Sequence, residues 1–327
     1  MRAVVAREPG GAEVLDYVEL PEPQPGSGQV LVKVAAAGVN FIDTYRRSGV
    51  YPMAFPHVVG SEGAGEVVAL GEDVDGFSVG DRVSWDNAPG SYAEFVSVDA
   101  SDAVRLPDGI DVVQAAALPL QGMTAHYLVN STFEVRPGHD VLLHAGAGGV
   151  GLLATQLATA RGGSVITTVG SAEKAELSRA AGAAEVIDYS ALADLTAELP
   201  PLVRELTAGA GVHVVYDGVG RATFDASLAS LHRRGLLVLF GGASGQVPPF
   251  DLQRLNSGGS LYVTRPTLAH YTATRTEIEW RMGDLFDAVL AGTLQVRIGA
   301  RYPLAEAAEA HRALEGRHTT GKVLLVP

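Results

Sequence analysis

Three glycines spaced as G-x-G-x-x-G are the residues of this 327-residue chain whose pattern points most directly to chemistry: Gly146, Gly148 and Gly151. An apolar run typical of a strand, 141–145, precedes them, and a segment typical of a helix, 149–161, follows. Between a strand and a helix such glycines allow a tight turn and a close approach to phosphate, which the helix N-terminus also favours. The motif predicts a dinucleotide site; an ordinary glycine-rich turn is the alternative.

The next predicted strand, 164–169, indicates which dinucleotide. It ends without the acidic residue that binds the ribose 2′-hydroxyl of NAD. Gly170 and Ser171 leave room there, and Lys174 follows one helical turn later. A hydroxyl and an ammonium suit a phosphate dianion, so the pattern favours NADPH. Lys174 could also be a solvated helix residue, but the chain has only three lysines, and we prefer the binding role.

The elements that must position these residues alternate between strand and helix from about residue 140. The predicted strands are 141–145, 164–169, 185–187, 212–216 and 236–240, and the predicted helices are 149–161, 172–181, 201–208 and 222–232. Such alternation predicts a parallel sheet with helices on both faces. The first 120 residues are instead rich in strands and turns, and the last part is mixed, with helices near 276–291 and 304–315 and a closing strand at 322–326. We therefore expect an α/β protein in which a Rossmann domain interrupts a β-rich domain.

Composition excludes several classes of function. The formal charge is −13 and no basic block occurs, so nucleic-acid binding is not expected. The chain contains no cysteine, which excludes disulfides, thiolate metal sites and a cysteine nucleophile. We expect no membrane span, because the uncharged stretch 141–160 coincides with the strand–turn–helix motif, and we expect a cytoplasmic protein because the start lacks a signal-like apolar run.

Besides the glycine loop, six segments form recognisable motifs: AGVNFIDTY (37–45), GSEGAG (60–65), VGDRV (79–83), ALPLQGMTA (117–125), YDGVG (216–220) and VTRP (263–266). Together these motifs resemble those of the zinc-free quinone oxidoreductases (zeta-crystallin-like) among the medium-chain dehydrogenases/reductases. The resemblance implies a GroES-like catalytic domain, 1–123 and 266–327, and a doubly wound Rossmann domain, 124–265. It also implies metal-free, NADPH-dependent hydride transfer to quinones by a homodimer, with Tyr262 on a strand that pairs across the dimer.

The chain departs from the zinc-dependent relatives at two metal-binding segments. Those relatives carry a Cys shortly before the Asp of the first motif and a His in a Gly-His-Glu motif. Here the segments are Gly38-Val39-Asn40 and Gly60-Ser61-Glu62, and a lone His57 makes no metal site. Without a Lewis acid, acceptors that delocalise the incoming charge, quinones or enones, are the easier substrates.

The resemblance also assigns site residues. Asn40 borders the nicotinamide, and Tyr45 and Tyr51 line the acceptor slot, which lies at the carboxyl ends of the sheet strands; either phenol could donate to the developing oxyanion or only shape the slot. Besides Asn40, the cofactor contacts expected from the glycine motif, the second strand and the resemblance are Thr124, Gly146, Ala147, Gly148, Gly149, Val150, Gly151, Gly170, Ser171, Lys174, Tyr189, Val219, Phe240, Gly241, Ser244, Val263, Thr264, Arg265 and Arg317.

Two other functions stay open at this point. A reductase of 2-alkenals, other enones or enoyl thioesters would use the same scaffold, although the acidic balance argues against a carrier-bound thioester. A protein that binds NADPH without turnover would be the non-enzymatic alternative.

Overall fold

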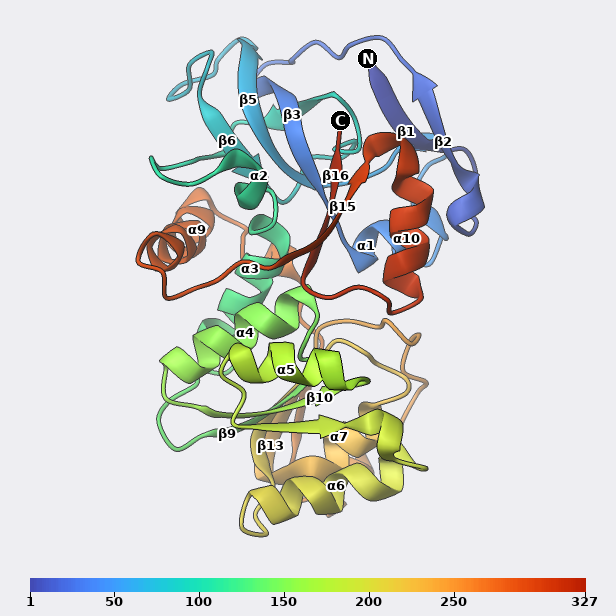
Figure 1. The fold of residues 1–327 in the computed structure, drawn as a ribbon, viewed down its shortest axis with the longest axis vertical. Helices are drawn as coiled ribbons and strands as arrows, with labels where there is room; N and C mark the ends of the chain where they lie inside the picture. The colour runs from blue at the N-terminus through green and yellow to red at the C-terminus, as the bar shows by residue number, and fades with distance from the viewer. The chain divides into compact units, whose positions relative to one another are not determined.

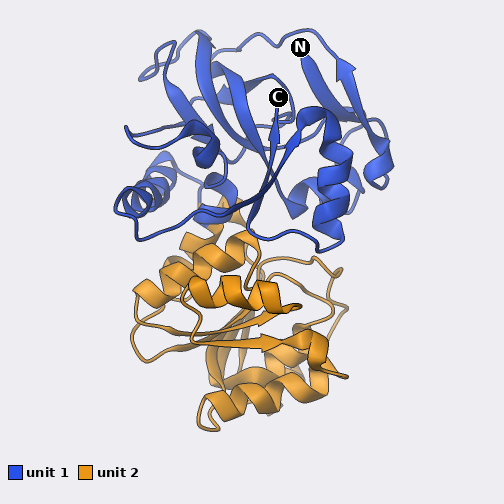
Figure 2. Cartoon of the chain, in the orientation of Figure 1, with its two compact units in different colours: residues 1–123, 272–327 blue, residues 124–271 orange.

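The computed structural model describes the whole chain, residues 1–327 (Figure 1). The chain divides into two compact units (Figure 2). Unit 1 comprises Met1–Met123 and Thr272–Pro327, and unit 2 comprises Thr124–Tyr271. The chain stays with unit 2 beyond Arg265 because the ring of Tyr271 stacks on Tyr127, with 4.3 Å between centroids. None of the helices is both long and apolar enough to cross a bilayer.

Unit 1 is built on a seven-stranded sheet and a three-stranded sheet. The larger sheet has the order β15-β16-β3-β5-β6-β8, with β7 paired to β3, and the smaller has the order β2-β1-β4. The strands are β1 (Arg2–Ala6), β2 (Leu15–Glu19), β3 (Gln29–Val39), β4 (His57–Val58), β5 (Glu62–Leu70), β6 (Arg82–Trp85), β7 (Phe95–Asp99), β8 (Val104–Arg105), β15 (Ile298–Pro303) and β16 (Lys322–Val326). The helices are α1 (Phe41–Arg47), α2 (Val112–Ala115), α9 (Arg275–Leu290) and α10 (Ala307–Glu315), and α3 (Pro119–Tyr127) begins in this unit. Alternating valines of β3, Val30, Val32 and Val34, pack with Trp85 in the core.

Strand register in the larger sheet brings distant residues together. Gly38 near the end of β3 lies opposite Glu62 of β5 on one side and Leu324 of β16 on the other. Since Lys322 begins β16 and Asn40 follows β3, the pairing places Lys322, Glu62 and Asn40 at one end of the three strands.

Unit 2 contains a six-stranded sheet of order β11-β10-β9-β12-β13-β14, and all its pairings are parallel. This is the 3-2-1-4-5-6 order of a doubly wound dinucleotide-binding fold. The strands are β9 (Asp140–His144), β10 (Ser164–Val169), β11 (Glu185–Asp188), β12 (Val212–Asp217), β13 (Leu231–Leu239) and β14 (Tyr262–Thr264). The helices are α4 (Gly149–Ala160), α5 (Ala172–Ala180), α6 (Leu195–Leu206), α7 (Phe224–Ser230) and α8 (Gln253–Ser257). Figure 1 shows α4 and α5 on one side of the strands and α6 and α7 on the other.

Two predicted boundaries in unit 2 were wrong. The helix predicted at 201–208 begins earlier, at Leu195, because the Asp194 carboxylate accepts from the N–H groups of Thr196 and Ala197; Pro200 and Pro201 lie inside the helix. The strand predicted at 236–240 begins at Leu231, inside the predicted helix 222–232. Its register against β12 shifts where Arg234 adopts a φ of 64°.

Candidate active site

The predicted cofactor residues of unit 2 gather at the carboxyl edge of its sheet, with Thr124 on α3 as the exception. The glycine loop follows β9, Ser171 follows β10, Tyr189 follows β11, and Val219 follows β12. Phe240, Gly241 and Ser244 come after β13, Val263 and Thr264 end β14, and Arg265 follows it. Because the strands are parallel, these segments share one edge, where doubly wound folds bind their ligands.

In the glycine loop, the glycines have other structural roles than the sequence pattern suggests. The left-handed residue of the turn is Ala145, with a φ of 56°, whereas Gly146 has no positive φ. A Cβ on Gly146 would lie 2.6 Å from Cβ of Thr167, and a Cβ on Gly151 would lie 2.2 Å from the carbonyl oxygen of Ala145. The first and third glycines are therefore needed for close packing.

The helix after the loop provides donors for an anion. Gly148 is the N-cap of α4 in an extended conformation, and no side chain caps it. The first N–H groups of a helix have no partner within it, and its N-terminus carries a partial positive charge. The backbone after Gly148 thus fits a pyrophosphate.

The loop after β10 fits the 2′-phosphate of NADPH. Ser171 caps α5 and accepts the N–H of Lys174 at 3.3 Å, so its hydroxyl hydrogen can still be donated. A Cβ on Gly170 would lie 2.6 Å from the phenol oxygen of Tyr189, which places that phenol against the loop. The carboxylate of Asp188 already accepts from the N–H and the hydroxyl of Ser190, at 2.9 and 2.7 Å.

A buried network that the sequence did not reveal ties three strand ends together beneath these loops. Ser227 donates its only hydroxyl hydrogen to Asp217 at 2.7 Å. The oxygen of Ser227 must therefore accept a hydrogen bond from Nε2 of His144, at 2.9 Å. With its hydrogen on Nε2, the His144 ring accepts at Nδ1 from the hydroxyl of Thr168, at 2.8 Å. Burial lowers the pKa of His144, which keeps the ring neutral as this pattern requires, although Asp217 opposes the shift. Asp217 also accepts the N–H of Val219 at 2.8 Å and so fixes that loop.

Ser244 has a structural partner that the prediction did not include. Its hydroxyl donates to the carbonyl oxygen of Val219 at 2.7 Å and accepts the N–H of Ala222 at 2.9 Å. The only hydroxyl hydrogen of Ser244 is therefore used to join the loops that follow β12 and β13.

The two predicted acceptor-site phenols of unit 1 lie together. Tyr45 is on α1, and Tyr51 follows this helix and donates its backbone N–H to the carbonyl of Tyr45 at 3.1 Å. Their rings meet edge to face, 5.5 Å between centroids, and both residues are half-buried. The start of α1 is fixed because the carboxylate of Asp43 accepts the backbone N–H of Asn40 at 2.9 Å.

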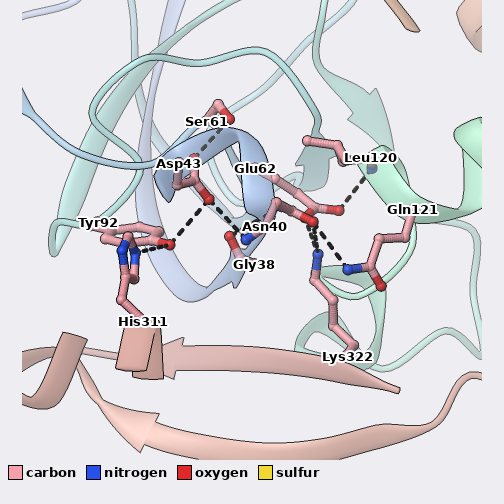
Figure 3. Close-up of polar contacts among 10 residues, drawn as sticks. All are labelled: Gly38, Asn40, Asp43, Ser61, Glu62, Tyr92, Leu120, Gln121, His311 and Lys322. Carbon is pink, nitrogen blue, oxygen red and sulfur yellow. Dashed lines mark hydrogen bonds and ion pairs between the residues drawn. The ribbon is translucent and has the colours of Figure 1, made fainter. Parts of the chain in front are cut away.

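Asn40 belongs to a buried ion-pair cluster (Figure 3). Lys322 and Glu62, 1% and 0% exposed in their side chains, form the pair. Lys322 Nζ also donates to Oδ1 of Asn40 at 2.8 Å, and Nδ2 of Asn40 donates to Glu62 at 2.6 Å. The other oxygen of Glu62 accepts the N–H of Leu120 at 2.8 Å in the first turn of α3. Burial lowers the pKa of Lys322, and attraction by Glu62 opposes that shift.

The carboxamide of Asn40 is thus held at both ends inside the protein, and Asn40 is 3% exposed. Its weaker donor contact is to the carbonyl of Gly38 at 3.4 Å. Gly38 must be a glycine, because a Cβ there would lie 2.1 Å from Oε2 of Glu62. The sequence signals for this cluster were the rarity of lysine and the glutamate of the GSEGAG motif, but neither indicated that they pair.

A second buried network extends from Asp43 (Figure 3). Tyr92 donates to Asp43 at 3.1 Å, Nε2 of His311 lies 3.2 Å from the Tyr92 hydroxyl, and Arg47 donates to Nδ1 of His311 at 3.0 Å. Arg47 also pairs with Glu315 at 2.7 Å. Burial raises the pKa of Asp43 from 3.8 to about 6, while burial and the charge of Arg47 lower the pKa of His311 to about 3.

The last predicted residues are Thr124 and Arg317, and the last feature is the possibility of a metal site. Thr124 lies on α3, largely buried, and Arg317 follows α10 in unit 1 with a φ of 59°. The hydroxyl of Ser61 lies 3.4 Å from Asp43. No group of three or more His, Asp or Glu side chains in residues 1–327 is arranged to hold a metal ion.

Comparison with known proteins identifies the family. Residues 26–108 match the family model for the alcohol dehydrogenase GroES-like domain, and residues 149–280 match the model described as zinc-binding dehydrogenase. A quinone oxidoreductase of Pseudomonas aeruginosa is 48% identical over 320 residues, which is 97% of both chains. A 2-haloacrylate reductase of a Burkholderia species is 41% identical over 99% of this chain and 98% of its own.

A solved structure extends the comparison to the whole fold. The mycobacterial protein Rv1454c, whose structure was determined in complex with NADPH, is 53% identical, with a TM-score of 0.97 and full coverage of both chains. The predicted GroES-like and Rossmann architecture is confirmed. This chain is an oxidoreductase of the quinone oxidoreductase family.

Proposed function

We propose that this oxidoreductase reduces quinones with NADPH. The observation that supports the cofactor is the edge of the unit 2 sheet, where a glycine loop lies beside Ser171 and Tyr189 and no acidic side chain stands at the end of β10; the first acid after it, Glu173, lies in the first turn of α5. When bound, NADPH supplies a hydride. A quinone that takes up this hydride and one proton becomes a hydroquinone.

The residues of the chain then have distinct roles. The N-terminus of α4 binds the pyrophosphate, and Ser171, Lys174 and Tyr189 bind the 2′-phosphate. Tyr45 and Tyr51 line the acceptor slot, where either phenol could donate a hydrogen bond to the oxygen on which charge develops. We expect no metal in the reaction.

The test measures the loss of NADPH absorbance in the presence of each acceptor of a panel. We expect turnover with 1,4-benzoquinone and phenanthrenequinone, unaffected by EDTA and weak with NADH. Inhibition by EDTA would contradict the metal-free mechanism, and NADPH binding without turnover of any acceptor would favour the non-enzymatic alternative.

The 2′-phosphate assignment has its own test. Lys174→Ala should raise KM for NADPH far more than for NADH, because only NADPH carries the dianion. Arg179→Ala is the matched control, since Arg179 lies in the last turn of the same helix and pairs with Glu176. Equal effects of Lys174→Ala on both cofactors would refute the assignment.

An enone reductase is the second candidate, because one relative at 41% identity is a 2-haloacrylate reductase. Tyr51→Phe tests whether the phenol of Tyr51 donates a proton to the acceptor or only packs against it. If the phenol donates a proton, kcat should fall more for an enone than for a quinone; indifference with both would make Tyr51 a packing residue.

We also propose a homodimer. β14 is an edge strand of the unit 2 sheet, and Tyr262 on it is 60% exposed, which is unusual for a large aromatic residue. Tyr262→Asp should shift the sedimentation of the protein from dimer to monomer; a monomeric unmodified protein would refute the proposal. The cytoplasmic location stays a prediction.

A further inference from the structure

The sheet of unit 2 assigns the two halves of a dinucleotide to different loops. A doubly wound sheet consists of two mononucleotide-binding halves, and its ligand lies across the crevice where the strand order reverses. Here that point lies between β9 and β12. Ser171 and Tyr189, which fit the 2′-phosphate, follow β10 and β11, so the adenosine half belongs to that side. The β12 loop, residues 218–220, and the β13 loop, residues 240–245, are therefore left for the nicotinamide mononucleotide half.

The β12 loop and the β13 loop are hydrogen-bonded to each other. The backbone N–H of Ala243 donates to the carbonyl of Gly218 at 3.2 Å, and that of Ser244 donates to the carbonyl of Val219 at 2.8 Å. The hydroxyl of Ser244 donates to the same carbonyl of Val219 at 2.7 Å. A Cβ on Gly241 would lie 2.5 Å from the carbonyl oxygen of Gly218, so the two backbones are also in close contact. The two loops therefore act as one body, and a shift of one displaces the other.

Asp217 fixes the β12 loop at its start. Its Oδ1 accepts the backbone N–H groups of Val219 at 2.8 Å and Gly220 at 3.0 Å, and its carboxylate also accepts from the hydroxyls of Thr223 and Ser227. A carboxylate only accepts hydrogen bonds, so all of these partners donate to it. Asp217 is 0% exposed and cannot touch a ligand itself. Any effect of Asp217 on a ligand must therefore pass through the loop.

These bonds determine which group of Val219 a ligand can contact. The N–H of Val219 is held by Asp217, and both lone pairs of its carbonyl oxygen are taken by the N–H and the hydroxyl of Ser244. The half-buried isopropyl group is what Val219 can offer. Contact through such a group depends on a close fit, because dispersion attraction weakens steeply when a gap of less than an ångström opens. The affinity of the loop for its ligand thus depends on the position that Asp217 and Ser244 give to Val219.

We propose that the β12 loop and the β13 loop bind the nicotinamide mononucleotide half of NADPH as one preformed surface, and that Asp217 and Ser244 are the positioning residues of this surface. The proposal rests on the proposed NADPH-dependent function. Binding of the adenosine half, on the loops after β10 and β11, should not depend on either residue.

The test compares two ligands, of which only one carries the nicotinamide mononucleotide half. NADP⁺ contains both halves, whereas adenosine 2′,5′-bisphosphate contains the adenosine half alone. Their dissociation constants are measured by calorimetry for the unmodified protein and for Asp217→Ala, Asp217→Asn and Ser244→Ala. Val203→Ala is the control for a general loss of stability, because Val203 lies on α6 and is fully buried in the core of unit 2.

Asp217→Ala and Ser244→Ala should each raise Kd for NADP⁺ about three- to tenfold, the range for loss of one or two buried methyl contacts. Neither should change Kd for adenosine 2′,5′-bisphosphate. Asp217→Asn should recover most of the affinity lost in Asp217→Ala, because its amide oxygen can still accept the N–H groups of Val219 and Gly220. Val203→Ala should leave the ratio of the two dissociation constants unchanged.

An unchanged ratio in Ser244→Ala, or in Asp217→Ala where that variant folds, would overturn the proposal, and so would a loss in Asp217→Asn as large as in Asp217→Ala. Ser244→Ala decides alone if Asp217→Ala does not fold, since it removes a single hydroxyl from a half-buried position. Failure of the unmodified protein to bind adenosine 2′,5′-bisphosphate, or to prefer NADP⁺ over NAD⁺, would instead contradict the proposed cofactor.

Discussion

Asp43→Asn should change how the stability of unit 1 depends on pH. Asp43 is 1% exposed and accepts hydrogen bonds from Tyr92 and from the backbone of Asn40 on one oxygen, with Ser61 near the other. An asparagine can keep its oxygen toward Tyr92 and Asn40 and turn its NH₂ toward the hydroxyl of Ser61. The substitution therefore removes the ionisation while it preserves the contacts.

The magnitude follows from the pKa of Asp43. Burial raises this pKa from 3.8 to about 6, so between these values the native state binds the proton more tightly than the unfolded state does. The stabilisation from protonation is complete below pH 3.8 and is lost as the pH rises through about 6. A shift of about 2 pKa units corresponds to about 3 kcal/mol. The stability of Asp43→Asn relative to the unmodified protein should thus rise by about 2 kcal/mol from pH 4 to pH 7, the greater part of this total.

Tryptophan fluorescence makes this change measurable in the correct unit. The two tryptophans, Trp85 and Trp280, both lie in unit 1, so urea unfolding followed by their emission reports the unit that contains Asp43. Asp108→Asn is the control for loss of one negative charge at an exposed side chain. A stability difference that is flat with pH, or that falls as pH rises, would refute the assigned shift.

Three further substitutions test other parts of the structure. Lys322→Met should destabilise unit 1 by about 3–5 kcal/mol because it leaves the Glu62 carboxylate buried without its partner, and the double variant with Glu62→Gln should recover most of this loss in the same urea assay. His213→Gln should make β12 less sensitive to acid in hydrogen exchange. Burial and the neighbouring His232 and His139 lower the pKa of His213, so the native state, which holds this ring neutral, loses stability as the pH falls below 6.5. Equal acid sensitivity of both proteins would contradict this assignment. Gly283→Ala should stabilise unit 1 by about 0.5–1 kcal/mol, since Gly283 lies inside α9 and nothing within 4 Å would meet the added Cβ; destabilisation would show that the helix surface is less open than described.

The fold was largely predictable because its two main sequence signals, the alternation of apolar strands with helices and the glycines of the turns, lie within short windows of the sequence. Strand 164–169 and the start of α4 at Gly149 follow from apolar runs and glycines within a short window. The two errors in unit 2 arose where a local rule was overridden. Pro200 and Pro201 are more typical of a helix start than of an interior, yet the Asp194 cap and the buried Leu199 and Val203 begin the helix earlier.

The position of a candidate residue in the fold was predictable only where a loop follows a strand. Ser171 and Tyr189 could be placed beside each other because β10 and β11 are neighbours in a doubly wound sheet. The cluster of Lys322, Glu62 and Asn40 could not, because Lys322 and Glu62 are 260 residues apart and meet only through the register of β16, β3 and β5. The direction of hydrogen bonds is also absent from the sequence, and it is this direction that lets Asp217 fix the β12 loop as an acceptor.

The direction of hydrogen bonds also decides whether the second buried network, from Glu315 to Asp43, can transfer a proton. The contacts from Glu315 at the surface through Arg47, His311 and Tyr92 to Asp43 resemble a path for protons. Arg47 does not release a proton, and it occupies Nδ1 of His311, so the ring must carry its hydrogen on Nε2 and donate to Tyr92. Every bond from Arg47 onward then donates toward Asp43, whereas Arg47 donates to Glu315 in the opposite direction, so Arg47 interrupts any transfer from Glu315. The network therefore holds Asp43 and the start of α1 in place and does not deliver a proton from Glu315.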